Sequence, residues 1–208
     1  MKYLFLIGLI ALTFVVISRN SATQQSTDSS STNTDTNSVQ YKTIAVKNGF
    51  EIREYPSLAV ASTELNSRSY SENSNSGFRK IASYIFGGNS SNQQISMTSP
   101  VQMDMGENPS MSFFMPENLN IDDLPVPNRK DVYVHIQPSK IVAVIQFSGW
   151  ASDTVLEEQF NKLKVKLKKE GIEFEDSYSY LGYNPPYKLI NRKNEVIIPL
   201  SNFKEPNI

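Results

Sequence analysis

The sequence predicts an α+β domain in which an antiparallel sheet or barrel carries two helices on its outside. Three observations lead to this fold class. Residues 41–65 alternate between apolar and polar side chains around an Asn-Gly pair, which is typical of a β-hairpin. Two later segments, 71–88 and 154–170, carry apolar residues at helical spacing. The order of strands, one helix and two further strands then occurs twice, which indicates an internal duplication.

Composition narrows the classes of function. The chain has 208 residues, a formal net charge of −1 and no cysteine. Disulfides, zinc–thiolate sites, iron–sulfur clusters and cysteine nucleophiles are therefore excluded. The chain has no surplus of basic residues, so its charge does not indicate a nucleic-acid partner. Once the N-terminal part is set aside, about 165 residues remain, which is enough for one substantial core.

The N-terminal part predicts targeting followed by a tether. Residues 3–17 are almost entirely apolar, a length that fits a signal peptide better than a spanning helix of about 20 residues. Small residues at cleavage spacing are hard to find, so residues 1–18 are predicted to be either a signal peptide or a short membrane anchor. The polar residues 19–39 are predicted to form a disordered linker. The domain at 40–208 is then expected outside the cytoplasm, whether periplasmic, secreted or membrane-anchored.

The first half of the domain opens with the hairpin. Its turn is Asn48-Gly49, and Pro56 separates the second strand from a third. A helical stripe follows and ends at a Gly-Gly pair; its four apolar residues are Phe78, Ile81, Ala82 and Ile85. The predicted elements are strands at 42–46, 50–55 and 58–65, a helix at 71–88, and short strands at 95–97 and 112–115.

The second half repeats this order. Thr154 and Glu157 offer a capping box for its helix, and Gly171 offers a stop. The two halves even end alike, in Phe-Phe-Met-Pro (113–116) and Val-Ile-Ile-Pro (196–199). The predicted elements are strands at 132–136 and 141–147, a helix at 154–170, and strands at 177–183 and 195–200.

Catalytic chemistry finds little support in the residues. A Ser-His-Asp triad would have to use the single histidine, His135, which lies among apolar residues of a predicted strand, and no Gly-x-Ser-x-Gly motif is present. A structural or surface role is favoured for His135, with metal or haem ligation and base catalysis as alternatives. Five methionines at 97–115 are interpreted as core or pocket lining, with metal ligation as the alternative. No catalytic residue is assigned, metal ligands stay unknown, and the chain is predicted not to be an enzyme.

An ordered set of local motifs nevertheless carries information. The chain contains Glu-Ile-Arg-Glu-Tyr-Pro (51–56), Tyr-Ile-Phe-Gly-Gly-Asn (84–89), Ile-Ser-Met-Thr-Ser-Pro-Val (95–101), Phe-Ser-Gly-Trp (147–150), Gly-Tyr-Asn-Pro-Pro-Tyr (182–187) and Arg-Lys-Asn-Glu-Val (192–196). In this order and spacing, the chain from residue 41 to residue 200 resembles the SOUL haem-binding family. The resemblance implies a distorted antiparallel β-barrel built from two pseudo-twofold related halves, with two flanking α-helices.

The resemblance also implies a ligand and a site. Haem or another porphyrin would bind in a shallow groove between the first helix and the loop before the last strand. Apolar side chains would cover the macrocycle, and cations would pair with its propionates. The expected cofactor-binding residues are Phe78, Arg79, Ala82, Ile85, Tyr187 and Lys188.

The expected function is haem buffering or transfer by an exported or membrane-anchored protein, with the membrane as a further partner if the N-terminal segment is not cleaved. The early strands contain no histidine that would match the axial ligand proposed for some relatives, so we expect a largely non-coordinating site or a Met or Tyr ligand. The alternatives are a binder of another small apolar ligand and, less favoured, a small-molecule hydrolase on the same scaffold.

Overall fold

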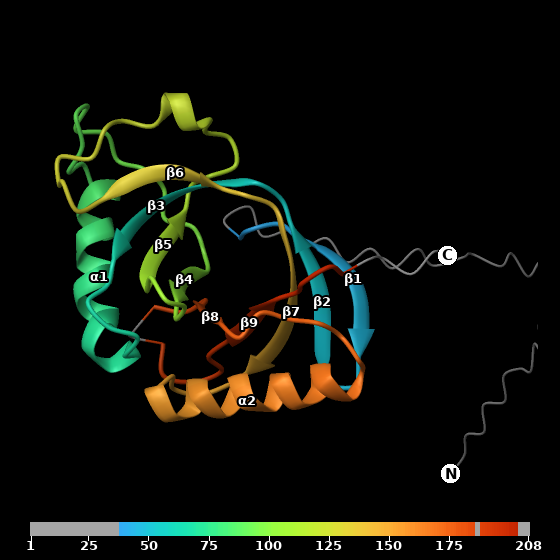
Figure 1. Ribbon diagram of the computed structural model, residues 1–208. Coiled ribbons are helices and arrows are strands. Elements are labelled where there is room, and N and C mark those ends of the chain that lie inside the picture. The colour runs from blue at the N-terminus through green and yellow to red at the C-terminus, as the bar shows by residue number, and fades with distance from the viewer. Residues whose placement is uncertain (1–37, 186–187, 204–208) are drawn as a thin grey trace, which may run out of the picture.

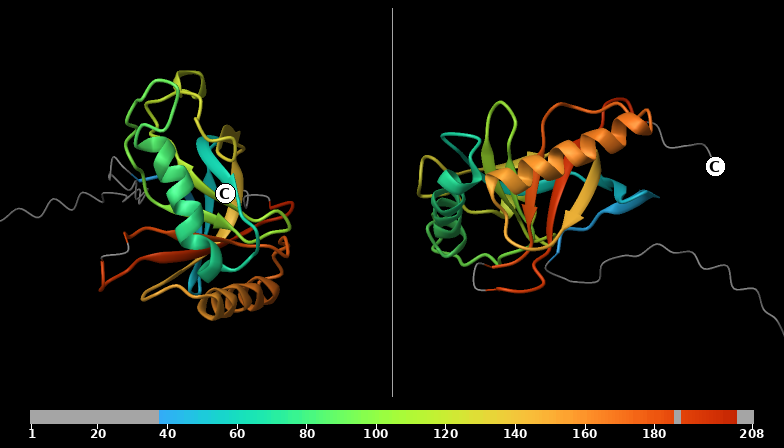
Figure 2. Two further views of the ribbon diagram at one scale, coloured as in Figure 1. Left: turned by 90° about the vertical axis from the view of Figure 1, so that its left-hand side faces the viewer. Right: turned by 90° about the horizontal axis from the view of Figure 1, so that it is seen from below.

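A computed structural model describes residues 38–185 and 188–203. Nine antiparallel strands form one sheet that curls into a half-barrel, and two long helices pack on its outside (Figures 1 and 2). The α+β barrel class with two flanking helices is confirmed. The predicted N-terminal segment at 1–18, nearly all of the linker at 19–39 and Tyr187 lie outside the described residues.

The elements agree with most of the predicted ranges. In chain order they are β1 (Lys42–Lys47), β2 (Phe50–Tyr55), β3 (Leu58–Glu64), α1 (Tyr70–Ile85), β4 (Val101–Asp104), β5 (Ser110–Phe114), a 3-10 turn η1 (Ile121–Asp123), β6 (Tyr133–Gln137), β7 (Lys140–Phe147), α2 (Asp153–Lys169), β8 (Ser179–Gly182) and β9 (Asn194–Pro199).

Two predictions are wrong in detail. Residues 95–97 form no strand; Ile95 is instead tied to α1, since its N–H donates to the Ile85 carbonyl over 2.8 Å. The strand lies further on, at β4, where pairing with both β5 and β8 buries a glutamine that alternation alone would have placed outside. The cap of α2 is Ser152, whose Oγ accepts from Val155 N, and not Thr154.

The sheet order confirms the two related halves. It runs β1-β2-β7-β9-β8-β4-β5-β3-β6. The four strands β2–β5 of the first half correspond in turn to β6–β9 of the second half. Exchanging each strand with its counterpart gives the same sheet order read from the opposite edge. Only β1 has no counterpart. The pseudo-twofold axis therefore passes between β4 and β8. The helices obey it as well, because α1 packs on β3 and β5 while α2 packs on β7 and β9.

The sheet has an apolar cluster on each face because successive side chains of a strand point to opposite sides. On the outer face, α2 buries the predicted stripe of Leu156, Phe160, Leu163 and Leu167. Burial of such side chains stabilises the fold by about 1.5–3 kcal/mol each. The concave face has a second cluster, which includes Tyr55, Phe114, Val142, Val144, Leu181 and Ile197.

Residues 38–41 run along this concave face before β1 begins. Val39 is buried in the concave cluster, and its N–H donates to the Ser99 carbonyl over 3.0 Å. The ring of Tyr41 lies 4.1 Å from the guanidinium carbon of Arg53. The segment that would connect to the linker is therefore packed as part of the domain. Neither helix of the described ranges is long and apolar enough to cross a membrane.

Candidate ligand-binding site

The predicted helix residues differ in their accessibility. Ala82 and Ile85 are buried beneath α1, and Ile85 belongs to the outer-face core. Phe78 is half-buried, with its ring centroid 5.1 Å from that of Phe113. Arg79 is exposed. Phe78 and Arg79 are thus the two of these four that a ligand outside the helix can reach, and their role in binding stays a prediction.

The loop between β8 and β9 carries the remaining predicted residues. Lys188 is exposed, whereas Tyr187 lies outside the described residues. Beside Lys188 the loop presents two large apolar side chains, Leu189 at 70% exposure and Ile190 at 76%. Adjacent exposed apolar side chains of this size are typical of binding surfaces. Neither residue was predicted, because an isolated Leu-Ile pair in a sequence does not show whether it is buried.

A buried arginine shapes this loop from within. Arg192 donates through Nη1 to the carbonyls of Pro185 (3.0 Å) and Lys188 (2.7 Å), and through Nη2 to that of Asn184 (3.2 Å). Its guanidinium carbon lies 4.5 Å from the ring centroid of Trp150, which is 56% exposed. Hydrogen bonds from a charged donor and the cation–π contact therefore hold the loop against the tryptophan.

Further contacts join this assembly to the start of α1. Asn194 donates through Nδ2 to the carbonyl of Gly149 (2.9 Å) and accepts at Oδ1 from Tyr180 Oη (2.8 Å). The Tyr180 ring meets the Tyr70 ring edge-on, with centroids 5.3 Å apart. Burial raises the pKa of Tyr180, so its hydroxyl keeps its proton and remains a donor.

One carboxylate ties the beginnings of the two helices together. Asp153, the first residue of α2, accepts from the backbone N–H of Tyr70 (2.6 Å) and of Ser71 (3.2 Å), and from the Ser71 hydroxyl (2.6 Å). Burial acts to raise the pKa of Asp153, but these hydrogen bonds outweigh it and lower the pKa. The carboxylate is therefore ionised at neutral pH, where it complements the positive end of α1.

These contacts bring three segments together that are far apart in the sequence. They are the start of α1, the loop before α2, and the β8–β9 loop, which projects near the N-terminal end of α1 (Figures 1 and 2). We define the Trp150–loop surface as the exposed side chains of Trp150, Leu189 and Ile190, with Lys188 at its edge. It combines apolar area with positive charge on a backbone that is held in place.

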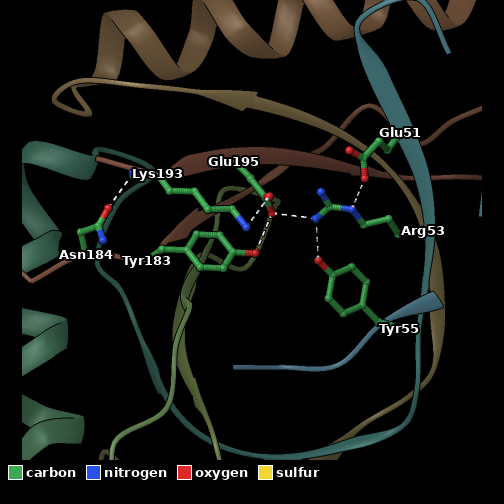
Figure 3. A network of polar contacts seen from close by, with 7 residues as sticks. All are labelled: Glu51, Arg53, Tyr55, Tyr183, Asn184, Lys193 and Glu195. Carbon is green, nitrogen blue, oxygen red and sulfur yellow. Dashed lines mark hydrogen bonds and ion pairs between the residues drawn. The ribbon is translucent and has the colours of Figure 1, made fainter. Parts of the chain in front are cut away.

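The base of the β8–β9 loop is anchored by a buried ionic network on the concave face (Figure 3). Glu195 has no exposed surface, and its Oε2 accepts from Arg53 Nη1 (3.0 Å) and Tyr183 Oη (2.7 Å). Its Oε1 lies 3.4 Å from Lys193 Nζ. Tyr183 and Lys193 are the two ends of the loop, so Glu195 fixes both of them to the sheet.

The guanidinium of Arg53 in this network stays charged despite its burial. Burial by itself would lower the pKa of Arg53, but Glu195 and the hydrogen bond from Nε to Glu51 (2.8 Å) raise the pKa above its ordinary value. For Tyr183, burial and the neighbouring Glu195 both raise the pKa. The tyrosine therefore donates its hydroxyl proton to the carboxylate throughout the physiological range.

The histidine and most methionines lie elsewhere. His135 is on β6, with Nε2 3.0 Å from Ser62 Oγ on the concave face. Four of the five methionines that the sequence singled out are buried in the outer-face core, namely Met103, Met105, Met111 and Met115. In the part of the chain that the structure describes, no three His, Asp or Glu side chains gather where they could hold a metal ion.

The fold is that of a small α+β protein, and the Trp150–loop surface is its candidate site for a ligand. The chain belongs to the SOUL family of heme-binding proteins, whose model matches residues 36–199. It is 33% identical over 156 residues to Heme-binding protein 2 of Homo sapiens, covering 71% of this chain and 76% of that protein.

Solved structures show the same fold at low identity. The C-terminal domain of EcmrR is 11% identical, with a TM-score of 0.54 over 74% of this chain and 98% of that one. A hydrolase from Listeria innocua is 10% identical, with a TM-score of 0.50 over 76% of this chain and 94% of that one. At such identities the likeness concerns the fold alone.

Proposed function

We propose that this protein binds haem or a related porphyrin on the Trp150–loop surface. The observation that carries the proposal is the exposure of Leu189 and Ile190 on the β8–β9 loop, which Arg192 holds in place, together with the exposure of Trp150, on which Arg192 stacks. A flat apolar macrocycle would cover these side chains with little further ordering of the loop, which favours binding. Family membership and the similarity to a protein named for heme binding support this ligand class.

Two exposed cations suit the acidic groups of a porphyrin. Lys188 is part of the surface edge, and Arg79 is exposed on α1. Within the described ranges neither side chain takes part in an ion pair. Both cations are therefore available to pair with propionates. Phe78, half-buried on the same helix, would add apolar contact.

We propose a binder rather than an enzyme. The nearest approach to a catalytic pair is Ser62 with His135, but Ser62 is almost fully buried, and the other ring nitrogen of His135 faces only the carbonyl of Ile136 at 3.3 Å. Among the described residues no carboxylate is hydrogen-bonded to the imidazole, and the burial of Ser62 keeps a substrate from its hydroxyl. Because His135 also lies on β6, away from the Trp150–loop surface, binding there would rest on apolar contact and charge.

Hemin titration of the full chain tests the proposal. We expect a Soret shift, and we expect protoporphyrin IX to quench the single tryptophan. The double substitution L189S/I190S should weaken hemin binding by about tenfold or more, because loss of even one such apolar contact removes about 1.5–3 kcal/mol. V165S, at a comparably exposed valine on α2, is the matched control and should bind as the wild type does.

Two outcomes would contradict the proposal. The first is the absence of both a Soret shift and tryptophan quenching. The second is unchanged hemin affinity in L189S/I190S. H135Q completes the design, since it should leave affinity and Soret position unchanged; a loss in H135Q would place the iron at β6 instead.

We further propose that the domain acts outside the cytoplasm, buffering or transferring haem while exported or tethered. The apolar residues 3–17 and the polar stretch that follows them support this. Intact-mass measurement of the protein from membrane and soluble extracytoplasmic fractions is the test. Loss of roughly the first 18 residues would indicate a signal peptide, and retention in the membrane fraction an anchor. Recovery of the intact chain only from the cytosol would overturn the proposal.

A further inference from the structure

The second half of α2 concentrates positive charge in a chain whose net charge is −1. Its lysines are Lys162, Lys164, Lys166, Lys168 and Lys169. Two of them have partners within the fold, since Lys164 pairs with Asp176 and Lys166 donates to the carbonyl of Asn48. Within the described ranges the other three form no ion pair, and all three are exposed.

These three lysines surround an exposed valine. Side chains three and four residues apart are neighbours on a helix surface, so Lys162, Lys168 and Lys169 flank Val165. The valine is 68% exposed. Its side of the helix faces away from the buried stripe, and α2 lies in front of the sheet when the molecule is seen from below (Figure 2). We define the α2 lysine face as Val165 with these three lysines.

The helix macrodipole explains only part of this face. The C-terminal end of a helix carries partial negative charge, which favours cations in its last turn. Lys168 and Lys169 belong to that turn, whereas Lys162 lies about two turns before the end. The macrodipole also gives no reason for a large exposed apolar side chain among the cations. The face therefore has the features of a surface that contacts a partner.

The chemistry of the α2 lysine face matches an anionic lipid surface. The acidic residues of α2 lie in its first half and are Asp153, Glu157 and Glu158. The second half therefore keeps its positive charge. At a bilayer surface, lysine ammonium groups pair with anionic headgroups, and an apolar side chain between them enters the interface.

We propose that the α2 lysine face docks on the anionic surface of a lipid bilayer. A nucleic acid fits less well, because the chain as a whole has no basic surplus. The choice of a bilayer rests in part on the tether of the proposed function. A polar chain of about 20 residues spans about 25 Å on average, so a tethered domain stays close to the membrane. Even a weak contact is then sufficient for docking.

The α2 lysine face is separate from the candidate site for haem. Trp150 precedes the helix, and Val165 lies about 18 Å along it from Asp153 at a rise of 1.5 Å per residue. Docking and hemin binding can therefore be measured independently.

A fluorescent label on α2 tests the proposal in the full chain. The chain has no cysteine, so V165C provides a single site for the environment-sensitive dye nitrobenzoxadiazole. We expect its emission to shift to the blue with vesicles of equal parts phosphatidylcholine and phosphatidylglycerol, and not with phosphatidylcholine alone. V126C carries the same dye at a valine that is 70% exposed on the loop before β6, and its emission should not shift with either vesicle.

Charge reversal identifies the lysines as the cause of the shift. In labelled V165C, K162E/K169E should raise the lipid concentration at the midpoint of the shift by about 30-fold, because each lysine contributes about 1 kcal/mol at an anionic surface. R68E/K130E makes the same change in net charge at two exposed cations outside α2. This matched control should retain the shift of the labelled parent.

Sedimentation of the same samples with the vesicles separates docking from the tether. An unshifted dye on a chain that sediments would overturn the docking proposal and leave the tether intact, and a shifted dye on a chain without its N-terminal segment would support docking. An equal shift with neutral vesicles, or an unchanged midpoint in K162E/K169E, would also overturn the proposal. So would a shift with duplex DNA but not with anionic vesicles, since the partner would then be a nucleic acid.

Discussion

Replacement of Glu195 by alanine should lower the free energy of unfolding by about 3–5 kcal/mol, the range measured when one partner of a buried ion pair is removed. Glu195 has no exposed surface, and Arg53 opposite it is also buried. Without the carboxylate, the guanidinium keeps Glu51 but loses its buried partner, and the hydroxyl of Tyr183 loses its acceptor. Urea denaturation of the wild type and the variant measures the difference.

A double variant separates the missing charge from the missing volume. In E195M/R53M both charges are replaced by apolar side chains, which often restores stability at buried pairs. We therefore expect the double variant to be more stable than Glu195→Ala. Asp131→Ala, which breaks surface ion pairs with Arg129 and Lys80, is the control and should change stability by no more than about 1 kcal/mol. A loss for Glu195→Ala no larger than for this control would contradict the buried network.

Replacement of Arg192 by alanine should weaken hemin binding by about tenfold or more, although the arginine is buried and belongs to no exposed surface. Its guanidinium holds three carbonyls of the β8–β9 loop and stacks on Trp150. A loop freed from these contacts has to be ordered again when a ligand binds, at about 0.5–1.5 kcal/mol for each side chain that is immobilised. Stability should also fall, by about 3 kcal/mol, because hydrogen bonds from a charged donor are lost.

Two measurements show whether Arg192 acts by positioning the loop. Trp150 emission should shift to the red in the unliganded variant, since the ring loses its cover. Arg192→Lys retains the charge but not the forked donor geometry, so it should recover hemin affinity only in part. Arg129→Ala removes an exposed arginine and should bind hemin normally. Unchanged emission and unchanged affinity in Arg192→Ala would show that the loop holds its shape without this side chain.

The regular elements could be predicted because their signals are local. The Asn48-Gly49 turn, the α2 stripe and the similar endings of the two halves are all readable within short windows, and the structure has the β1–β2 hairpin, the helix and the strands β5 and β9 there. β4 was missed for the opposite reason. Its place between β5 and β8 buries Gln102, and pairing with strands distant in the sequence leaves no mark in a four-residue segment.

The candidate site was predicted less completely. Periodicity placed Phe78, Ala82 and Ile85 on one face of α1, but it could not show that the sheet, and not a ligand, covers Ala82 and Ile85. Arg192 and Trp150 belong to the segments that carry the family resemblance, but the sequence assigned neither residue a role in the site. Their contact joins residues 42 positions apart, a separation that no sequence pattern reports.

The order of side chains along the chain is enough to predict most of the strands, both helices, the duplication and the family, because each of these leaves a local pattern. The two flanking helices and the barrel of related halves follow from that order. The division of the apolar residues between core and surface became visible in the folded chain alone. Burial depends on neighbours brought in from elsewhere in the chain, as Arg192 and Glu195 illustrate at the β8–β9 loop.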